Sequence, residues 1–407
     1  MDVMTGITIL IVTGLLIKLT DHEFRQPYHP LKLYLAIWGL GLGLASLPLV
    51  DYTPITSAGW IAASLGAIAF SGGILTTSWG CPRQPSDLTI DTQLLSRILV
   101  YSTVVGCLGT VLQAMFLERS FGLDVYLTDP VEARRLHTHI PIWGYLDLVN
   151  TVNVAAVALY WQKTGRPRLF MWLTLASATA SALLTTDRTR FFLMLIWAEL
   201  VAGSRNPRRR YLRIGIVAVI LIGYFSVIGD HYERSYLERF QHIIHLPKPL
   251  KILADPYIYY TSSFTAMGQL VDQPSTMLMG KSSFAPIVHV ASAVWDIEQA
   301  PLVGEFTYVP MEVNTYTYLR QFYADFGWLG IVLGPYLCGL FCGWTEVKRR
   351  NNPTVGWSLL AALMGYCCVI STFENLFIQE AIWFLAVICA ALGFYEQRRY
   401  SRESSIE

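Results

Sequence analysis

Residues 314–344 read NTYTYLRQFYADFGWLGIVLGPYLCGLFCGW, a stretch that changes from polar and aromatic to apolar just after Asp325. The apolar part is long enough for a helix that crosses a membrane. On a helix, Tyr316, Arg320 and Tyr323 would share one face, because they follow one another at i, i+4 and i+7. A cation among aromatic rings at the mouth of such a helix can hold an anionic ligand that carries a ring. The alternative is an interfacial belt, in which Tyr and Arg only anchor the helix at headgroup level.

The composition of the whole chain indicates a membrane protein. Of its 407 residues, 53% are hydrophobic and 14% are charged, whereas soluble domains carry about 25% charged residues. The net charge of +1 argues against nucleic acid as a partner, because nucleic-acid binding requires a concentrated basic surface. The seven cysteines lie in or beside apolar runs, so we expect no disulfide framework and no zinc site.

Eleven apolar runs approach the length of a membrane-spanning helix and predict an all-α polytopic membrane protein. They lie at 3–19, 33–50, 58–78, 96–117, 141–161, 168–185, 190–203, 211–228, 321–344, 355–372 and 377–395. The expected organisation is eight helices in 1–228, one large external loop in 229–319 that packs on the bundle, and three helices with a cytoplasmic tail in 320–407. Most Lys and Arg residues lie on the inner side if the N-terminus is outside, so we expect an external N-terminus and a cytoplasmic C-terminus.

The large loop opens with a segment that we expect to form an amphipathic helix on the bilayer surface. Leu237, Phe240, Ile243 and Ile244 would lie together on one side of that helix. A further short helix is expected at DPYIYYTSSFTAMGQL, residues 255–270. A loop of this length should fold back over the helices and act with them.

Several arginines lie in short segments that this topology places outside, where the positive-inside rule disfavours them. They are Arg119, Arg134, Arg135, Arg188 and Arg190. Arg188 and Arg190 occupy a very short turn at the membrane surface, where two guanidinium groups could hold a phosphate or diphosphate through paired hydrogen bonds. Alternatively, Asp187 pairs with one of these arginines and closes the turn.

The run at 141–161 carries an acidic residue in its outer half. Asp147, Asn150 and Thr151 lie on one face of the expected helix. Because a carboxylate at that depth is costly, it predicts either a functional cavity or a hydrogen bond between helices, and the residues alone leave both open.

Nucleotide and metal motifs are missing from the sequence. There is no Walker A motif, no GxGxxG after a strand, no HExxH and no CxxC pair. We therefore expect no metal and no cofactor. An external reaction would use a preactivated substrate that carries its own leaving group.

The polytopic layout, the RTRF turn at 188–191, the long late loop and the sequence NTYTYLRQFYADFGWLG at 314–330 together resemble the Wzy-type oligosaccharide repeat-unit polymerases of bacteria. Enzymes of this family assemble O-antigen, capsule and exopolysaccharide. The resemblance implies a GT-C-like bundle in the bacterial inner (plasma) membrane. It also implies a glycosyltransferase that joins undecaprenyl-diphosphate-linked oligosaccharides, as donor and acceptor, on the periplasmic side. The transfer would be metal-independent and inverting, the bilayer would be a partner, and a chain-length regulator could be another.

The expected site residues follow from the charge that grows on the departing diphosphate, which guanidinium groups stabilise more in the transition state than in the ground state. The candidates for diphosphate binding are Arg188, Arg190, Arg320 and Arg234. The candidates for the base that takes the acceptor proton are His289, Glu305 and Asp325, which the sequence does not rank. The candidates for stacking on sugar rings are Tyr316, Tyr323 and Trp295, with structural packing as the alternative for each.

Two other functions fit the same sequence features. An O-antigen ligase-like enzyme would use the same donor and a lipid A core acceptor. A transporter or flippase of lipid-linked saccharide, from a different class, would favour internal repeats and broken helices at matching positions, and neither stands out here.

Overall fold

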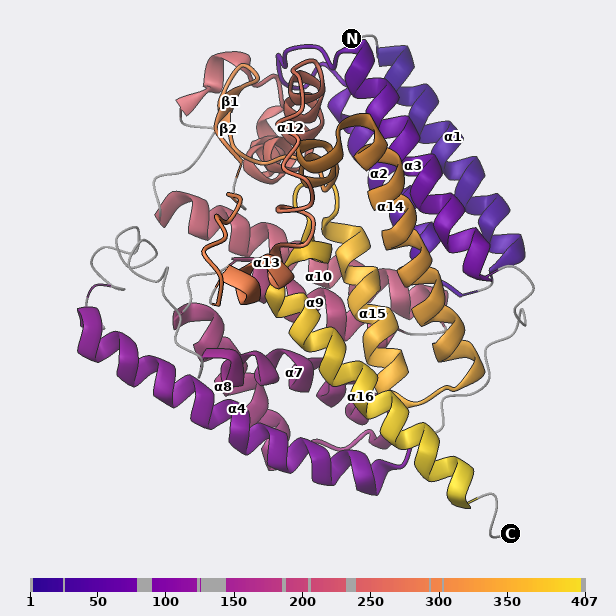
Figure 1. Cartoon of the computed structure of the whole chain (residues 1–407), viewed down its shortest axis with the longest axis vertical. Helices are drawn as coiled ribbons and strands as arrows, with labels where there is room; N and C mark the ends of the chain where they lie inside the picture. Colours follow the sequence, from indigo (N-terminus) through magenta and orange to yellow (C-terminus); the bar gives the residue numbers. More distant parts are fainter. Residues whose placement is uncertain are drawn as a thin grey trace. The chain divides into compact units, whose positions relative to one another are not determined.

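The computed structural model of the chain is shown in Figure 1. It describes residues 3–24, 26–78, 90–122, 125, 144–184, 188–203, 206–231, 239–292, 294–301 and 304–403. Within these ranges there are 13 α-helices, three short 3-10 helices and one two-stranded hairpin. The prediction of a helical protein is therefore confirmed.

Each predicted apolar run overlaps one α-helix. These helices are α1 (Val3–Glu23), α2 (Pro30–Ala45), α3 (Ser57–Ser78), α4 (Thr92–Phe121), α7 (Gly144–Thr164), α8 (Leu169–Leu184), α9 (Arg188–Val201), α10 (Pro207–His231), α14 (Leu319–Asn351), α15 (Val355–Ile370) and α16 (Glu380–Glu403). In the described part of the chain, α1, α3, α4, α14 and α16 contain segments long and apolar enough to cross a membrane, and α2, α8 and α15 are shorter apolar helices. These helices support a membrane-embedded protein, whereas eleven spans remain a prediction.

The surface of α1 shows why a bilayer suits this chain. Only 6% of its apolar segment Val3–Asp21 is buried inside the protein. Leu15 and Leu19 on this helix are 57% and 67% exposed. One side of α1 packs on α2. A helix that exposes apolar side chains over the rest of its surface is stable in hydrocarbon, where its backbone is satisfied internally, and poorly stable in water.

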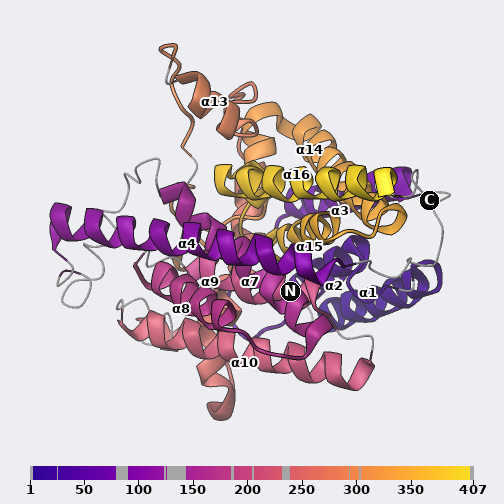
Figure 2. The same ribbon diagram turned by 90° about the horizontal axis from the view of Figure 1, so that it is seen from below.

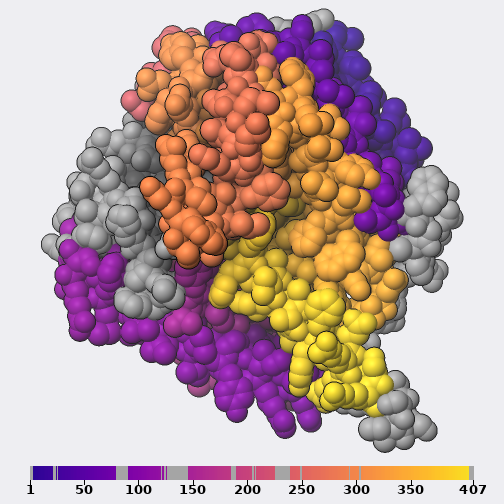
Figure 3. All heavy atoms as spheres, viewed as in Figure 1, coloured from indigo at the N-terminus to yellow at the C-terminus, as the bar shows by residue number. Residues whose placement is uncertain are grey.

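In the described residues between α10 and α14 there are the helices α12 and α13 and the hairpin. α12 (Ala254–Val271) matches the helix predicted at 255–270, and α13 (Ala285–Ser292) follows it. β1 (Thr307–Tyr308) pairs with β2 (Glu312–Val313) in antiparallel register. The 3-10 helices are η1 (Gln241–Ile243), η2 (Lys248–Leu253) and, before α16, η3 (Leu376–Ile378). On the face drawn in Figure 3, orange atoms of the stretch between α12 and α14 lie at the surface.

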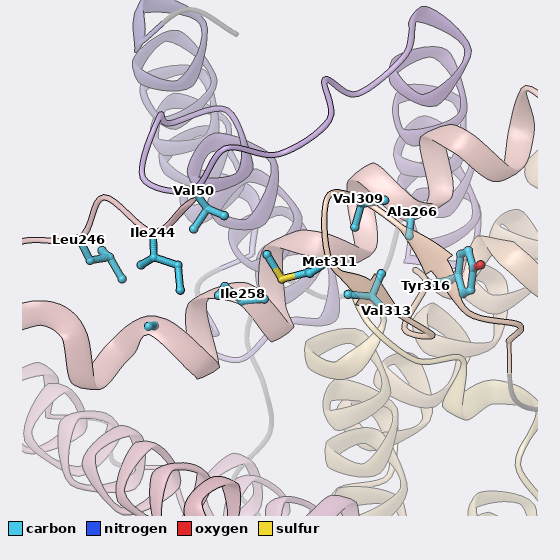
Figure 4. Close-up of a cluster of buried hydrophobic side chains, with 10 residues drawn as sticks. Val50, Ile244, Leu246, Ile258, Ala266, Val309, Met311, Val313 and Tyr316 are labelled. Atoms are coloured by element: carbon cyan, nitrogen blue, oxygen red, sulfur yellow. The ribbon is translucent and has the colours of Figure 1, made fainter. Parts of the chain in front are cut away.

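The expected amphipathic helix at 237–244 is not found over residues 240–244, where the structure has the 3-10 helix Gln241–Ile243 and then Ile244 in an extended conformation. Leu237 lies outside the described residues, and Phe240 and Ile243 pack against a buried cluster that includes Ile244 and Val50 (Figure 4). Val50 and Ile244 also form an isolated antiparallel bridge. The prediction was wrong because these side chains are covered by other parts of the chain, which periodicity along one segment cannot reveal.

The chain divides into two compact units, each assembled from separate stretches of sequence. Unit 1 comprises Met1–Ser86, Ser235–Asn352 and Cys367–Trp383, and unit 2 comprises Asp87–Arg234, Pro353–Tyr366 and Phe384–Glu407. The predicted loop 229–319 thus belongs mainly to unit 1, where α12 packs against α2 and α3.

Unit 1 is built around the contact between α3 and α14. A side chain at Gly339 would place its Cβ 2.1 Å from the carbonyl oxygen of Phe70, so only glycine allows this approach of the two backbones. Tyr318, just before α14, is fully buried, and its hydroxyl lies 3.1 Å from that of Tyr34 on α2. These contacts fix the start of α14 within unit 1.

Unit 2 is built around α7, which packs against α4, α8 and α9 (Figures 1 and 2). A Cβ at Gly109 of α4 would lie 2.6 Å from the backbone nitrogen of Asp147 on α7. Nearby, a Cβ at Gly106 would lie 2.1 Å from the side-chain oxygen of Asn150. These two glycines bring the polar face of α7 directly against α4.

Candidate functional site

Arg190, one of the predicted diphosphate-binding residues, is buried in unit 2. Its Nη1 donates to Asp147 Oδ2 at 2.5 Å and to Ser181 Oγ at 2.9 Å. The Arg190 side chain is 10% exposed and that of Asp147 is not exposed at all. The partner of Arg190 is therefore a carboxylate on α7, whereas Asp187, the partner considered from sequence, lies outside the described residues.

Hydroxyl and amide groups from neighbouring helices complete the environment of Asp147. Its Oδ1 accepts from Thr110 Oγ1 on α4 at 2.7 Å and from Asn150 Nδ2 at 3.1 Å. Its Oδ2 also accepts from the Ser181 hydroxyl on α8. Of the two interpretations of Asp147, the interhelical hydrogen bond is the one observed, and it joins α4, α7, α8 and α9.

The side chains of two further predicted arginines, Arg188 and Arg234, lie outside what the structure describes. Arg188 is the first residue of α9, and the structure describes its backbone only. Arg234 lies outside the described residues.

Arg320 belongs to unit 1 and lies in the first turn of α14. The helix begins at Leu319, so Tyr316 precedes it, and the predicted helical face of Tyr316, Arg320 and Tyr323 is wrong. Arg320 nevertheless contacts Tyr316, because its guanidinium carbon lies 5.5 Å from the centre of that ring. This is the geometry of a cation–π contact.

Tyr316 is held in place by the chain before the hairpin. Its hydroxyl donates to the main-chain oxygen of Glu305 at 2.9 Å, and a Cβ at Gly304 would lie 2.5 Å from its ring. Burial raises the pKa of Tyr316, and the nearby charge of Arg320 opposes that shift. The tyrosine is thus a fixed, neutral platform beside the arginine, and the exposed side chain of Glu305 adds a negative charge nearby.

Of the other two aromatic candidates, Tyr323 is packed and Trp295 is open. Tyr323 is 4% exposed, its hydroxyl donates to Gln273 O at 2.6 Å, and its ring lies 6.2 Å from that of Trp328. Trp295, in the turn after α13, is 64% exposed. Tyr323 therefore has the packing role considered as its alternative, and Trp295 is available to a ligand or a surface.

The start of α14 contains a break next to Asp325. Gly327 has φ 58° and ψ −140°, so α14 consists of two helices joined at this glycine. The preceding carbonyl groups accept hydrogen bonds from the loop after α12: Leu278 N donates to Ala324 O at 3.0 Å, and Ser275 Oγ donates to Tyr323 O at 2.6 Å. The loop thereby satisfies backbone groups that a break leaves without helical partners.

Asp325 takes part in the same connection. Its two carboxylate oxygens accept from the backbone N–H groups of Ser282 at 3.1 Å and Ser283 at 2.5 Å, and the residue is not exposed. This geometry gives Asp325 a structural role at the break, since a base must be able to approach the acceptor hydroxyl.

His289 is the candidate base with the most suitable surroundings. Its Nδ1 is hydrogen-bonded to Oε1 of Glu380, the first residue of α16. The side chains of His289 and Glu380 are 56% and 30% exposed. In the tautomer that donates from Nδ1 to Glu380, Nε2 is the nitrogen with the lone pair.

No motif or spacing in the sequence connects Glu380 with a site. It lies 91 positions from His289, and no spacing rule relates residues so far apart. Its position at the start of the last apolar run was the only available signal.

A buried charged cluster lies at the other end of α14. Glu346 is 1% exposed and accepts hydrogen bonds from Arg349 Nε at 2.9 Å and from Arg350 Nε at 2.8 Å. Arg349 also donates to the side-chain oxygen of Gln26. The cluster joins the turn between α1 and α2 to the end of α14.

His29 is part of this cluster and caps α2. It is fully buried, its ring stacks on Phe24 with centroids 4.0 Å apart, and its Nδ1 accepts from Leu31 N at 3.3 Å. Burial lowers the pKa of His29 to about 3; Glu346 opposes this shift and the charge of Arg350 adds to it. His29 is therefore a neutral residue of the folded protein.

Comparison of the chain with protein-family models, with curated proteins and with solved structures finds no significant match.

Proposed function

We propose that this chain is a glycosyltransferase of the bacterial inner membrane that polymerises undecaprenyl-diphosphate-linked oligosaccharide repeat units. The proposal includes a GT-C-like bundle of about 11 spans, a periplasmic N-terminus and large loop, and a cytoplasmic C-terminus. Its supports are the sequence resemblance at 188–191 and 314–330 and the geometry around the start of α14.

The contact between Arg320 and Tyr316 is the observation that carries the proposal. It puts a cation and a fixed ring where α14 begins, eight residues before the exposed apolar Trp328. A diphosphate linked to a membrane lipid has to lie at this level, because its lipid part stays in the bilayer. A guanidinium can form two parallel hydrogen bonds to phosphate oxygens, and Tyr316 limits the directions in which it points.

His289 supplies the base in this proposal. Nε2 removes the proton from the acceptor hydroxyl, and the oxygen attacks the anomeric carbon of the donor. The bond from that carbon to the diphosphate oxygen breaks, and its electron pair leaves with the diphosphate, which Arg320 stabilises. Glu380 holds the His289 ring and stabilises the imidazolium that forms.

Arg190 has a smaller part in the proposal than the sequence suggested. Asp147 already neutralises its charge, so the diphosphate role goes first to Arg320, with Arg188 and Arg234 as further candidates. Of the three candidates for stacking on a sugar, Trp295 is the exposed one, and a lipid-linked saccharide could reach it only at the membrane surface.

The test is elongation by the purified protein in detergent. The probe is the lipid-linked saccharide extracted from cells in which the gene for this chain has been deleted. Products longer than one repeat unit are expected on separation by mass. Failure of well-folded protein to lengthen the saccharide would contradict the proposal, and transfer to lipid A core instead would identify the ligase-like alternative.

A transporter of lipid-linked saccharide is the second candidate, and the Asp147–Arg190 pair favours it. Ionisable pairs inside apolar helices often mark the pathways of pumps and transporters. Detergent removes the second compartment that transport requires. Elongation under these conditions would therefore exclude pure transport, and saccharide movement across proteoliposomes without elongation would support it.

A further inference from the structure

α13 and the turn after it expose a row of large apolar side chains. Phe284, Ile287, Val290 and Val294 are 47%, 54%, 73% and 73% exposed. Ile287 and Val290 share one face of α13, whereas Phe284 lies just before the helix and Val294 in the turn after it. His289 lies on the opposite side, toward Glu380 of the same unit. An apolar row of this kind usually marks a surface that contacts a partner or a membrane.

The beginning of this segment is fixed to the start of the apolar part of α14. Ser282 and Ser283 donate their backbone N–H groups to the carboxylate of Asp325. Only a few residues later, α14 exposes Leu329, Leu333 and Leu337 at helical spacing, with exposed fractions of 60%, 48% and 59%. This is the stripe expected to face lipid if α14 crosses a membrane, so its first residues mark the edge of the hydrocarbon.

The helix itself is fixed to the start of a second apolar helix. His289 binds Glu380, the first residue of α16, and α16 exposes Trp383 and Val387 one and two turns later, at 39% and 67%. α13 has eight residues and is thus about 12 Å long. The segment that contains α13 is therefore fixed near the beginning of two helices, α14 and α16, that are long and apolar enough to span a membrane. Figure 2 shows α13 at the edge of the chain.

We propose that α13 is an interfacial helix: its exposed residues Ile287 and Val290, together with the flanking Phe284 and Val294, lie in the bilayer surface at which α14 and α16 begin. The partner is the glycerol and upper acyl region of the lipids. Exposed Trp295 fits this depth, because tryptophan is enriched at membrane–water interfaces. This inference does not depend on the proposed enzymatic activity.

The test is a depth measurement on the full chain in vesicles of phosphatidylethanolamine and phosphatidylglycerol. Nitroxide labels are attached to Val290→Cys and Val294→Cys, with Glu312→Cys on the hairpin as the exposed polar control. Labelled wild-type protein gives the background from native cysteines. Labels at 290 and 294 should collide several-fold more often with oxygen, which concentrates in lipid, than with a water-soluble nickel chelate. The control should show the reverse preference.

Two outcomes would overturn the proposal. Labels at 290 and 294 that are as accessible to nickel as the control would place α13 in water. Spectral broadening that disappears on dilution with unlabelled protein would instead identify a second copy as the partner. A second measurement uses brominated lipids, which quench the fluorescence of nearby tryptophans. The quenched fraction should be larger in the wild type than in Trp295→Phe. Equal fractions would contradict an interfacial Trp295.

Discussion

Arg190 Nη1 lies 2.5 Å from Asp147 Oδ2, in a position where neither side chain has appreciable contact with solvent. Removing two charges from water is costly, and here the cost is offset by the ion pair together with hydrogen bonds from Thr110, Asn150 and Ser181. Arg190, which the sequence predicts to bind an external anion, is thus part of the interior of unit 2.

Breaking this pair is expected to destabilise the protein. Either Asp147→Asn or Arg190→Met leaves the other charge buried and uncompensated, which costs about 3–5 kcal/mol. The double variant should lose less than the sum of the two single losses, because it removes both charges. Unfolding by dodecyl sulfate in mixed micelles measures these differences. Strictly additive losses would show that the two residues do not interact.

Asp325 is expected to behave as a structural residue. Asp325→Asn removes the charge and one acceptor from the connection to Ser282 and Ser283, where hydrogen bonds to a charged group are worth about 1.5–3 kcal/mol each. Limited proteolysis should then cut residues 275–300 faster than in the wild type. Glu305→Gln, at an exposed carboxylate, is the control and should leave the cleavage rate unchanged.

The positions of the helices could be predicted because the length of an apolar run is a local property of the sequence. The run at 321–344 was found in this way and corresponds to α14. Even there, the break at Gly327 was not predicted, since a glycine within an apolar helix is usually tolerated. Only the loop that satisfies the freed carbonyl groups explains why the break is stable.

The sequence identified residues with suitable chemistry for the candidate site, but not the residues with which they interact. Sequence drew attention to Arg190, Asp325 and His289, but the partner of each is tens of residues away or more: Asp147, Ser282 with Ser283, and Glu380. The partner determines whether the side chain is neutralised by an ion pair, bound to backbone groups, or free to act on a ligand. The same limit explains the error at 237–244, where Ile244 is covered by Val50.

Arg320 is expected to be required for elongation. Arg320→Ala should reduce the rate by about 10²–10³-fold, as the loss of one charge-stabilising donor does in other enzymes. Arg320→Lys should recover only part of the rate, because a lysine lacks the paired donors. Arg188→Ala is expected to have the same effect, whereas Arg209→Ala, at an exposed site on α10, is the control. Wild-type product lengths in Arg320→Ala and Arg188→Ala would end the diphosphate assignment.

The pair formed by His289 and Glu380 is expected to contribute the base. His289→Ala should lower elongation by about 10²–10⁴-fold, and Glu380→Gln by less, because the imidazole remains. His245 offers a matched control: its Nε2 lies 2.9 Å from Asp51 Oδ2, it is also partly exposed, and it belongs to the same unit. If His245→Ala reduced the rate as strongly as His289→Ala, a specific role for His289 would be untenable.

Stability at acid pH is expected to depend on His29. Its pKa is about 3 in the folded protein, against the ordinary histidine value of 6.5 in an unfolded chain, so between these values the unfolded chain binds more protons. The contribution of neutral His29 to the free energy of unfolding is therefore complete above about pH 6.5. As the pH falls toward about 3, the free energy of unfolding decreases by about 1.4 kcal/mol for each pH unit. Thermal unfolding in detergent between neutral pH and pH 5 measures this loss.

The variant His29→Asn can still cap α2 through its side-chain oxygen, and its unfolding temperature should fall less over the same interval. The control His242→Asn, at an exposed histidine, should lose as much unfolding temperature in acid as the wild type does. If His29→Asn lost as much as the wild type, groups other than His29 would cause the acid sensitivity.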